Sequence, residues 1–221
     1  MNDRPVEDIP DQVASSGGLI AALEVIADEA PAEGMTLKDF TQALGGRAFG
    51  LALFALSVPV SIPLLYGIPQ IVALPMLVIA LQMAMDRPEP WMPRRFGERV
   101  LGKAVLQQIS ARARTYFGWI ERAARPRLLL LFRPTAERLM GAIFVVFSAS
   151  ILIPLPATNT LPGIGIAIAS IGLVTRDGRL ALVGLAIGAA WILLLVVGIS
   201  LLGPASVELF KQFAEGLVGR G

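Results

Sequence analysis

The stretch IPLPATNTLPGIGIA (residues 153–167) lies between two apolar runs in the second half of the chain. It contains three prolines, two glycines and the polar triplet Thr158-Asn159-Thr160. A proline removes a backbone N–H donor and clashes with the preceding helical turn, so a plain helix does not continue through this stretch. In lipid, the freed backbone groups are tolerated only where protein or water satisfies them. The stretch therefore predicts one helix end and one helix start, joined by a short break.

The composition indicates an integral membrane protein. Of the 221 residues, 55% are hydrophobic and 16% are charged, which is more apolar than an ordinary soluble domain. The chain contains no cysteine and no histidine, which excludes disulfides, thiolate or imidazole metal ligands, and Ser-His catalysis. No phosphate-binding glycine motif is present either. We therefore expect neither an enzyme nor a bound cofactor or metal.

Five uncharged apolar runs follow one another from residue 49 onward. The last run, 180–202, is long enough for a bilayer crossing, which needs about 20 apolar residues. The other four are short and proline-broken, and they form two pairs: 49–65 with 68–85, and 139–155 with 161–174. Each pair predicts a helical hairpin that either crosses the membrane or re-enters on the same side, and the sequence leaves both forms open.

The two predicted hairpins resemble each other. Four residue types recur at a spacing of 91: Arg47 with Arg138, Gly50 with Gly141, Ser57 with Ser148, and Pro63 with Pro154. Further on, ALQMAMDRP (80–88) aligns with SIGLVTRDG (170–178) after one residue is removed. The pattern predicts an internal duplication, with parallel and inverted copies both open. Duplicated hairpins with broken helices are typical of transporters whose site lies between the repeats.

Charge is distributed unevenly along the chain. Residues 86–138 hold twelve basic and five acidic residues, whereas residues 1–48 hold three basic and nine acidic ones. The positive-inside rule places the basic segment in the cytoplasm, close to anionic lipid. No nucleic-acid-binding motif accompanies the charge, so we expect no nucleic-acid partner.

The expected fold class is an all-α integral membrane protein with two repeated proline-broken hairpins, a C-terminal transmembrane helix and amphipathic surface helices. Thr36 with Asp39 predicts the capped start of a short helix that ends at Gly45-Gly46, and residues 1–15 are expected to be disordered. The expected segments are an acidic, partly disordered part (1–35), repeat 1 (36–90), a basic amphipathic cytoplasmic linker (91–126), repeat 2 (127–178), the transmembrane helix (179–203) and a tail (204–221).

Neutral polar groups near the breaks are the candidate ligand site. Their hydroxyls and amides, with backbone carbonyls freed by the prolines, suit an ion or hydroxylated solute. The alternatives are that Thr158, Asn159 or Thr160 caps the next helix, that the serines bond to their own helices, and that Gln82 cross-links helices. The candidate residues are Ser57, Pro63, Gln82, Ser148, Pro154, Pro156, Thr158, Asn159, Thr160 and Pro162.

No charged residue lies inside the apolar runs, which argues against a proton relay through a buried carboxylate. Asp86, Glu137 and Asp177 stand at the ends of the runs beside basic residues, where surface ion pairs are expected. Gly184 and Gly188 form a small helix face that suits close helix packing or a homodimer.

Three motifs in order, LPMLVIALQMAMDRPEPWMPRRF (74–96), WIERAARPRL (119–128) and IPLPATNTLPGIGIAIASIGLVTRDG (153–178), resemble the exopolysaccharide-synthesis ExoD family over residues 36–202. The resemblance implies a bacterial inner-membrane protein associated with exopolysaccharide production and alkaline tolerance, without supplying a molecular activity. The first break, IPLLYGIPQ (62–70), departs from the glycine-rich turn of the family.

Two functions follow as hypotheses, with the lipid bilayer as the expected environment of both. The first is a small transporter or channel for an ion or small solute, with a neutral site at the paired breaks. The second is a non-catalytic membrane partner of polysaccharide or envelope assembly. An enzyme acting on lipid-linked sugars is disfavoured, because the apolar runs carry no set of acid, base and metal ligands.

Overall fold

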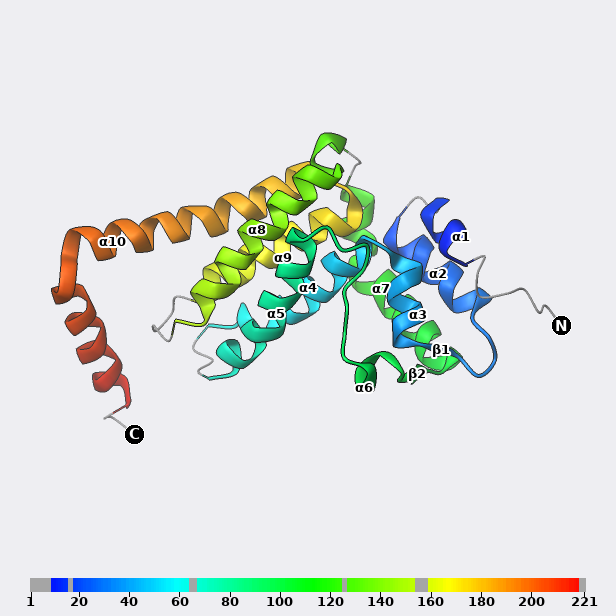
Figure 1. Ribbon diagram of the computed structural model, residues 1–221, viewed down its shortest axis with the longest axis horizontal. Coiled ribbons are helices and arrows are strands. Elements are labelled where there is room, and N and C mark those ends of the chain that lie inside the picture. Colours follow the sequence, from blue (N-terminus) through cyan, green and yellow to red (C-terminus); the bar gives the residue numbers. More distant parts are fainter. Residues whose placement is uncertain (1–8, 16–17, 64–66, 125–126, 154–158, 219–221) are drawn as a thin grey trace.

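The computed structural model describes residues 9–15, 18–63, 67–124, 127–153 and 159–218 (Figure 1). These residues are predominantly helical, and two helices among them are long and apolar enough to cross a membrane. The elements in chain order are α1 (Ile9–Ser15), α2 (Leu19–Glu29), β1 (Met35–Thr36), α3 (Leu37–Leu44), α4 (Arg47–Val60), α5 (Ile68–Ala84), α6 (Arg94–Gly97), β2 (Val100–Leu101), α7 (Lys103–Ala123), the 3₁₀ turn η2 (Leu129–Phe132), α8 (Pro134–Ile151), α9 (Thr160–Thr175) and α10 (Gly178–Val218).

Four apolar helices form the central bundle. Helix α4 packs along α9, and α5 packs along α8, so each helix of one pair contacts a helix of the other. The bundle core is filled by fully buried large side chains, among them Leu53, Met76, Phe144, Phe147 and Ile166. The outer faces are apolar as well. Along α5 and at its end, five exposed apolar side chains at helical spacing face outward: Ile71, Leu74, Val78, Leu81 and Met85. This is the pattern of a lipid-facing helix.

Two glycines allow the helix pairs to approach closely. A Cβ added at Gly50 of α4 would lie 2.8 Å from Val174 Cγ2 and 3.1 Å from Leu173 Cβ, both on α9. A Cβ added at Gly141 of α8 would lie 2.5 Å from the backbone nitrogen of Ala84 on α5. Each glycine therefore stands where its partner helix leaves no room for a larger residue.

Helices α5 and α9 end in the same way. Asp86 (φ 61°) and Arg176 (φ 52°) adopt the left-handed conformation that closes many helices. The N–H of the next residue then reaches back to a carbonyl five positions earlier, from Arg87 to Gln82 at 3.1 Å and from Asp177 to Gly172 at 2.9 Å. The chain leaves both helices through an equivalent turn, at the end of the bundle where α4 and α8 begin.

Helix α10 packs antiparallel to α9 through small residues. A Cβ at Gly184 would meet the backbone nitrogen of Ala169, and one at Gly172 would meet the backbone nitrogen of Ala181. Gly188 lies against the ring of Phe147. The small face predicted at Gly184 and Gly188 thus packs within the chain, and a homodimer through it stays a prediction. Beyond the bundle α10 bends at Gly203 (φ 53°), and Figure 1 shows it reaching past the ends of α8 and α5.

The lengths of the helices limit which of them cross a membrane. The apolar part of α10, Gly178–Gly198, has 21 residues and spans about 31 Å, close to the hydrocarbon thickness of about 30 Å. Helix α8, with 18 residues, also qualifies. Helices α4, α5 and α9 have 14, 17 and 16 residues and reach roughly 21 to 26 Å. The hairpins are therefore shorter than α10.

A second hydrophobic core lies beyond the basic end of the bundle. Helices α1, α2, α3 and α7 form it, and α2 packs along α7. The expectation of disorder over residues 1–15 is wrong for 9–15, because Ile9 and Val13 lie one helical turn apart and both bury in this core. The predicted cap at Thr36 is confirmed: its Oγ1 accepts from the Asp39 N–H at 3.1 Å and donates to Asp39 Oδ2 at 2.7 Å.

A short strand pair, which the sequence did not predict, ties the second core to the linker that follows α5. Strands β1 and β2 are antiparallel, with Met35 opposite Leu101 and Thr36 opposite Val100. Gly34 (φ 95°) makes the close approach possible, since a Cβ there would meet the Leu101 carbonyl oxygen. The linker is thereby fixed beside α3.

Candidate functional site

The end of α4 and the start of α9, which flank the two breaks, lie together at one end of the bundle. A Cβ at Gly163, in the first turn of α9, would lie 3.0 Å from Val60 Cγ1 and 3.2 Å from Ser61 Oγ at the end of α4. Pro162 is fully buried, whereas Pro63 is exposed. Of the remaining candidates at this break, Pro154, Pro156 and Thr158 fall outside the described residues.

Asn159 and Thr160 begin the helix after the second break. Asn159 is buried and occupies the N-cap position of α9, and its carbonyl accepts from the Gly163 N–H at 3.0 Å. Within the described part of the chain, its side chain makes no capping hydrogen bond to the helix. Side-chain capping, one of the alternatives for the polar triplet, is therefore not what Asn159 does here. Ligand binding by Asn159 and Thr160 stays a prediction.

The candidate serines differ in how their hydroxyls are satisfied. Ser57 is fully buried and donates to the Phe54 carbonyl of its own helix at 2.8 Å. Ser148 is equally buried, but among the described residues its hydroxyl has no hydrogen-bond partner, and the same holds for Ser170 of α9. An unpaired buried hydroxyl is costly. Among the described residues, the buried side-chain atoms without a hydrogen-bond partner are these two hydroxyls and Gln70 Oε1 in the first turn of α5.

Gln82 lies far from the breaks, near the C-terminal end of α5. Its side-chain amide makes two hydrogen bonds to the backbone of Trp91 in the linker. The Trp91 N–H donates to Gln82 Oε1 at 2.5 Å, and Gln82 Nε2 donates to the Trp91 carbonyl at 3.2 Å. Fourteen residues separate Gln82 from the start of α5 at Ile68, which corresponds to about 21 Å. The structure therefore does not bring Gln82 together with the break residues.

The opposite, basic end of the bundle holds a charged cavity of about 420 Å³, which we call the vestibule. Both hairpins line it. Its floor is apolar and includes the buried Phe49, Met83 and Leu173, while Asp86, Arg87 and Arg176 at its rim are exposed. The cavity thus opens outward and closes toward the bundle core. The ionisable residues of its lining are Arg47, Asp86, Arg87, Glu137 and Arg176.

Fixed contacts position several of these charges. Arg138 Nη1 lies 3.8 Å from Asp86 Oδ2, joining α8 to the end of α5. Arg47 Nη1 donates to the carbonyls of Val13 and Gly18, at 3.4 and 3.3 Å, which ties α4 to the N-terminal helices. Glu137 is half-buried, with Arg176 and Asp86 as its charged neighbours. The expected ion pair is thus confirmed for Asp86.

Asp177 has a role that the sequence did not predict. It is 5% exposed, and its Oδ1 accepts from the N–H groups of Arg179 at 2.9 Å and Leu180 at 3.5 Å. This is the pattern of an N-cap, here at the start of α10. Asp177 therefore stabilises the start of α10, and the surface ion pair expected for it stays a prediction.

The sequence analysis placed the candidate site at the breaks, whereas the charged cavity lies at the opposite end of the hairpins. The polar triplet at the break is conspicuous, whereas the vestibule residues are scattered from residue 46 to residue 176 and meet only in the fold. One signal pointed to them: Arg47 and Arg138, with Asp86 and Arg176, occupy matching positions of the predicted repeat. Charges at matching ends of two packed hairpins are expected to meet.

Comparisons with known proteins bear on this arrangement. The family described as "Exopolysaccharide synthesis, ExoD" matches residues 19–197. Protein ExoD of Rhizobium meliloti (strain 1021) is 28% identical over 149 residues, covering 65% of this chain and 62% of that protein. Uncharacterized protein slr1875 of Synechocystis sp. (strain ATCC 27184 / PCC 6803 / Kazusa) is 29% identical over 157 residues, covering 69% and 70%.

The chain therefore spans less than two thirds of the rhizobial relative's length. No solved structure matches it. The family match covers both hairpins, the vestibule between them and most of the apolar part of α10. This chain belongs to the ExoD family of exopolysaccharide-synthesis proteins.

Proposed function

We propose that the protein is a small, non-catalytic transporter of the bacterial inner membrane, which moves an ion or small solute along the interface of two duplicated hairpins. The observation that carries the proposal is the vestibule, because residues of both hairpins line it at the end where they meet. Transporters built from repeats with broken helices hold their sites at such an interface.

The duplication is supported by matching contacts at matching positions. Gly50 meets Leu173 and Val174 across one helix pair, and Gly141 meets Met83 and Ala84 across the other. With the repeat offsets of 91 and 90, the first contact set maps onto the second. The helix-ending turns at Asp86 and Arg176 match in the same way. Because both hairpins start and end at the vestibule, the copies run parallel.

The charge of the vestibule favours an anion at the entrance. Three guanidinium groups face two carboxylates in the lining, and Arg138 contacts one of these carboxylates from the side. Cavities lined by one excess sign of charge raise the local concentration of the opposite ion. Below the floor, apolar side chains such as Phe144 and Phe147 fill the core. The hairpins must therefore move apart before a solute reaches Ser148 and Ser170.

The orientation follows from the same charges. The linker and vestibule hold the basic residues of the chain's centre, so the positive-inside rule places them in the cytoplasm. The solute then enters the vestibule from the cytoplasm, and the two breaks lie toward the opposite membrane surface. Ion movement in this direction would also fit the alkaline tolerance that the family resemblance implies.

Purified protein reconstituted in liposomes tests the proposal directly, with dyes sensitive to pH and to individual ions reporting flux under imposed gradients. The variant Arg87→Gln/Arg176→Gln is expected to slow the initial flux of an anion by roughly tenfold, because it removes the attraction at the rim. Arg112→Gln/Arg114→Gln on α7 removes two charges away from the vestibule and should leave the flux unchanged. An absence of flux under every gradient would rule out the transport function.

A second function, a non-catalytic partner in polysaccharide or envelope assembly, is favoured by one observation. A groove of about 510 Å³ runs between α3 and residues 87–98, with Lys38, Arg87, Trp91 and Arg94 in its lining. It lies outside the apolar bundle, where a partner protein can reach it. Chemical cross-linking in membranes followed by affinity capture should then yield a synthase or export component. A monomer or homodimer without other proteins would count against this function.

A further inference from the structure

Two connecting segments leave the basic end of the bundle with apolar side chains exposed. Segment 91–100 follows α5, and segment 127–133 precedes α8. In the first, Trp91, Phe96 and Val100 are 54 to 61% exposed; in the second, three consecutive leucines, 128 to 130, are 49 to 64% exposed. Both segments lie outside the lipid-facing helices, so the bundle's own burial in lipid does not account for them.

The first segment is held in place rather than loose. The double hydrogen bond between the Gln82 amide and the Trp91 backbone ties it to the end of α5. The β1–β2 pair ties its other end to α3, and the Leu37 N–H donates to the Arg99 carbonyl at 2.8 Å. The exposed rings of Trp91 and Phe96 are therefore presented by a fixed backbone.

The second segment is fixed to the start of α10. The Gly178 N–H donates to the Arg127 carbonyl at 2.9 Å, and a Cβ at Gly178 would lie 2.7 Å from Leu128 Cβ. Leu128 itself is left-handed, with φ 53°. Such a conformation is unfavourable for a leucine, and here it leads into a 3₁₀ turn that exposes further leucines. Strain that presents apolar side chains to the outside indicates an apolar environment there.

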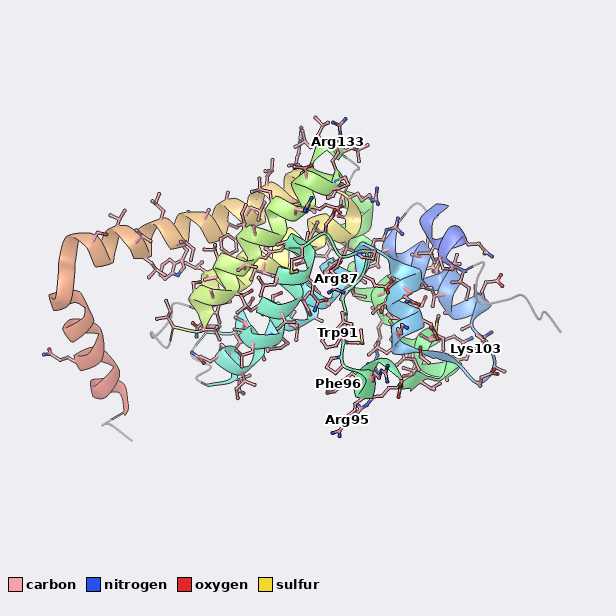
Figure 2. The ribbon with its side chains drawn as sticks, in the orientation of Figure 1. Arg87, Trp91, Arg95, Phe96, Lys103 and Arg133 are labelled. Atoms are coloured by element: carbon pink, nitrogen blue, oxygen red, sulfur yellow. The ribbon has the colours of Figure 1, made fainter. Side chains whose placement is uncertain are left out.

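Arginines flank the exposed apolar groups in both segments. The sequence WMPRRFGERV (91–100) contains three arginines and one glutamate, and RLLLLFR (127–133) contains two arginines and no acid. Arg94, Arg95 and Arg133 are exposed and make no ion pair in the described part of the chain. The Arg99 guanidinium carbon lies 5.5 Å from the Phe96 ring centroid. Figure 2 shows Trp91, Arg95 and Phe96 on one side of the molecule and Arg133 on the opposite side.

We propose that the two segments form an interfacial collar that binds anionic phospholipid at the basic end of the bundle. Trp91, Phe96 and the leucines at 128 to 130 insert at the headgroup level, where amphipathic rings and apolar side chains are favoured. The arginines bind the lipid phosphates, because guanidinium groups match phosphate oxygens and basic residues beside a membrane are attracted to anionic lipid. The collar sets how deep the short hairpins sit in the bilayer.

The three tryptophans of the chain, Trp91, Trp119 and Trp191, provide the test. One variant, Trp119→Phe/Trp191→Phe, retains the collar tryptophan. A second, Trp91→Phe/Trp119→Phe, retains Trp191, which lies 13 residues into α10, about 20 Å from its start. Each variant is reconstituted in phosphatidylcholine vesicles with or without phosphatidylglycerol, and with bromine atoms at a shallow or a deep position of the acyl chains.

Trp91 is expected to emit at shorter wavelength than water-exposed indole, and shallow bromines should quench it more than deep ones. Trp191 should show the reverse preference. Adding phosphatidylglycerol should increase the shallow quenching of Trp91. In the Trp91-only background, Arg94→Gln/Arg95→Gln should reduce this increase by several-fold, whereas Arg112→Gln/Arg114→Gln on α7 should preserve it.

Two results would overturn the proposal. The first is emission of Trp91 at the wavelength of exposed indole, without quenching, in helical, vesicle-bound protein, while Trp191 of the second variant is quenched in vesicles of the same composition. The second is shallow quenching that is equal with and without phosphatidylglycerol, which would mean apolar insertion without recognition of anionic lipid. Quenching of Trp191 in the second variant shows that this variant has inserted into the membrane, and a helical circular dichroism spectrum checks the folding of each Trp91-only variant.

Discussion

Hairpin α4–α5 and hairpin α8–α9 place a glycine in the same helical position, but the surroundings of the two glycines differ. Gly50 faces side-chain atoms of Val174 and Leu173 and one backbone atom, the Ser170 carbonyl oxygen, whereas the three atoms nearest Gly141 all belong to the backbone of Met83 and Ala84. Side chains can shift by a few tenths of an ångström, and a helix backbone cannot do so without moving the whole helix. The α5–α8 contact is therefore the tighter of the two.

The serines at matching positions of the two hairpins also differ, in how their hydroxyls are hydrogen-bonded. Ser57 satisfies its hydroxyl within its own helix, whereas Ser148 leaves its hydroxyl without a partner among the described residues. The first hairpin also leads into the collar segment 91–100, while the second leads directly into α10. If the hairpins are copies, as proposed, they kept their backbone contacts and diverged in side-chain bonding and in their exits.

The largest effect is expected from alanine at the two glycines. Gly141→Ala should destabilise the fold by about 2 to 3 kcal/mol, because the new methyl group meets backbone atoms and overpacking of this kind is costly. Gly50→Ala should cost less, about 1 kcal/mol, since the Val174 side chain can move and alanine gains helix propensity, although Leu173 Cβ and the Ser170 carbonyl oxygen stay close. Unfolding by sodium dodecyl sulfate in mixed micelles, followed by circular dichroism, measures both. Equal losses would contradict the difference between the two contacts.

A second comparison concerns the exits of the hairpins. Gln82→Ala removes both hydrogen bonds that hold Trp91 and should lower the local stability of the linker by about 1 to 2 kcal/mol. The matching position of the second hairpin is Gly172, which has no side chain for this purpose. Hydrogen exchange should rise in residues 88–97 and remain unchanged in α8 and α9. Unchanged exchange in the linker would show that other contacts fix segment 91–100.

The helix-ending turns should respond alike. Asp86→Gly and Arg176→Gly each relieve a left-handed conformation at a non-glycine residue and should stabilise the protein by about 1 kcal/mol. The exposed ion pair between Asp86 and Arg138 reduces this gain only slightly. The same unfolding titration measures the two variants. Gains of opposite sign would argue against equivalent turns.

The smallest effect is expected at the serines, where the sign matters. Ser148→Ala removes a buried hydroxyl without a described partner and should be neutral or stabilise by about 0.5 kcal/mol, whereas Ser57→Ala loses an intrahelical bond and should destabilise by a similar amount. In liposomes, a role of Ser148 in solute passage predicts reduced flux for Ser148→Ala despite its unimpaired stability. Unchanged flux would exclude this hydroxyl from the path.

The sequence predicted the helical membrane fold, the capped start of α3 at Thr36, its end at Gly45, and the family. These predictions succeeded because each rests on local chemistry: apolar run length, a capping hydroxyl, a glycine in a positive-φ position. The disorder expected for residues 9–15 was wrong, because Ile9 and Val13 bury against helices that follow them in the chain. The N-cap role of Asp177 was not predicted, since its partners are the first N–H groups of the next helix.

By itself, the sequence determined which segments are apolar, where proline interrupts them, and which residues recur at a spacing of about 90. These properties follow from residues close to one another or from simple alignment. Only the tertiary structure decided that the charges at the hairpin ends enclose a vestibule, and that the Gln82 amide fixes Trp91. It also decided that Gly184 and Gly188 pack within the chain. Such contacts depend on how helices cross, and the crossing is set by the shapes of all packed side chains together.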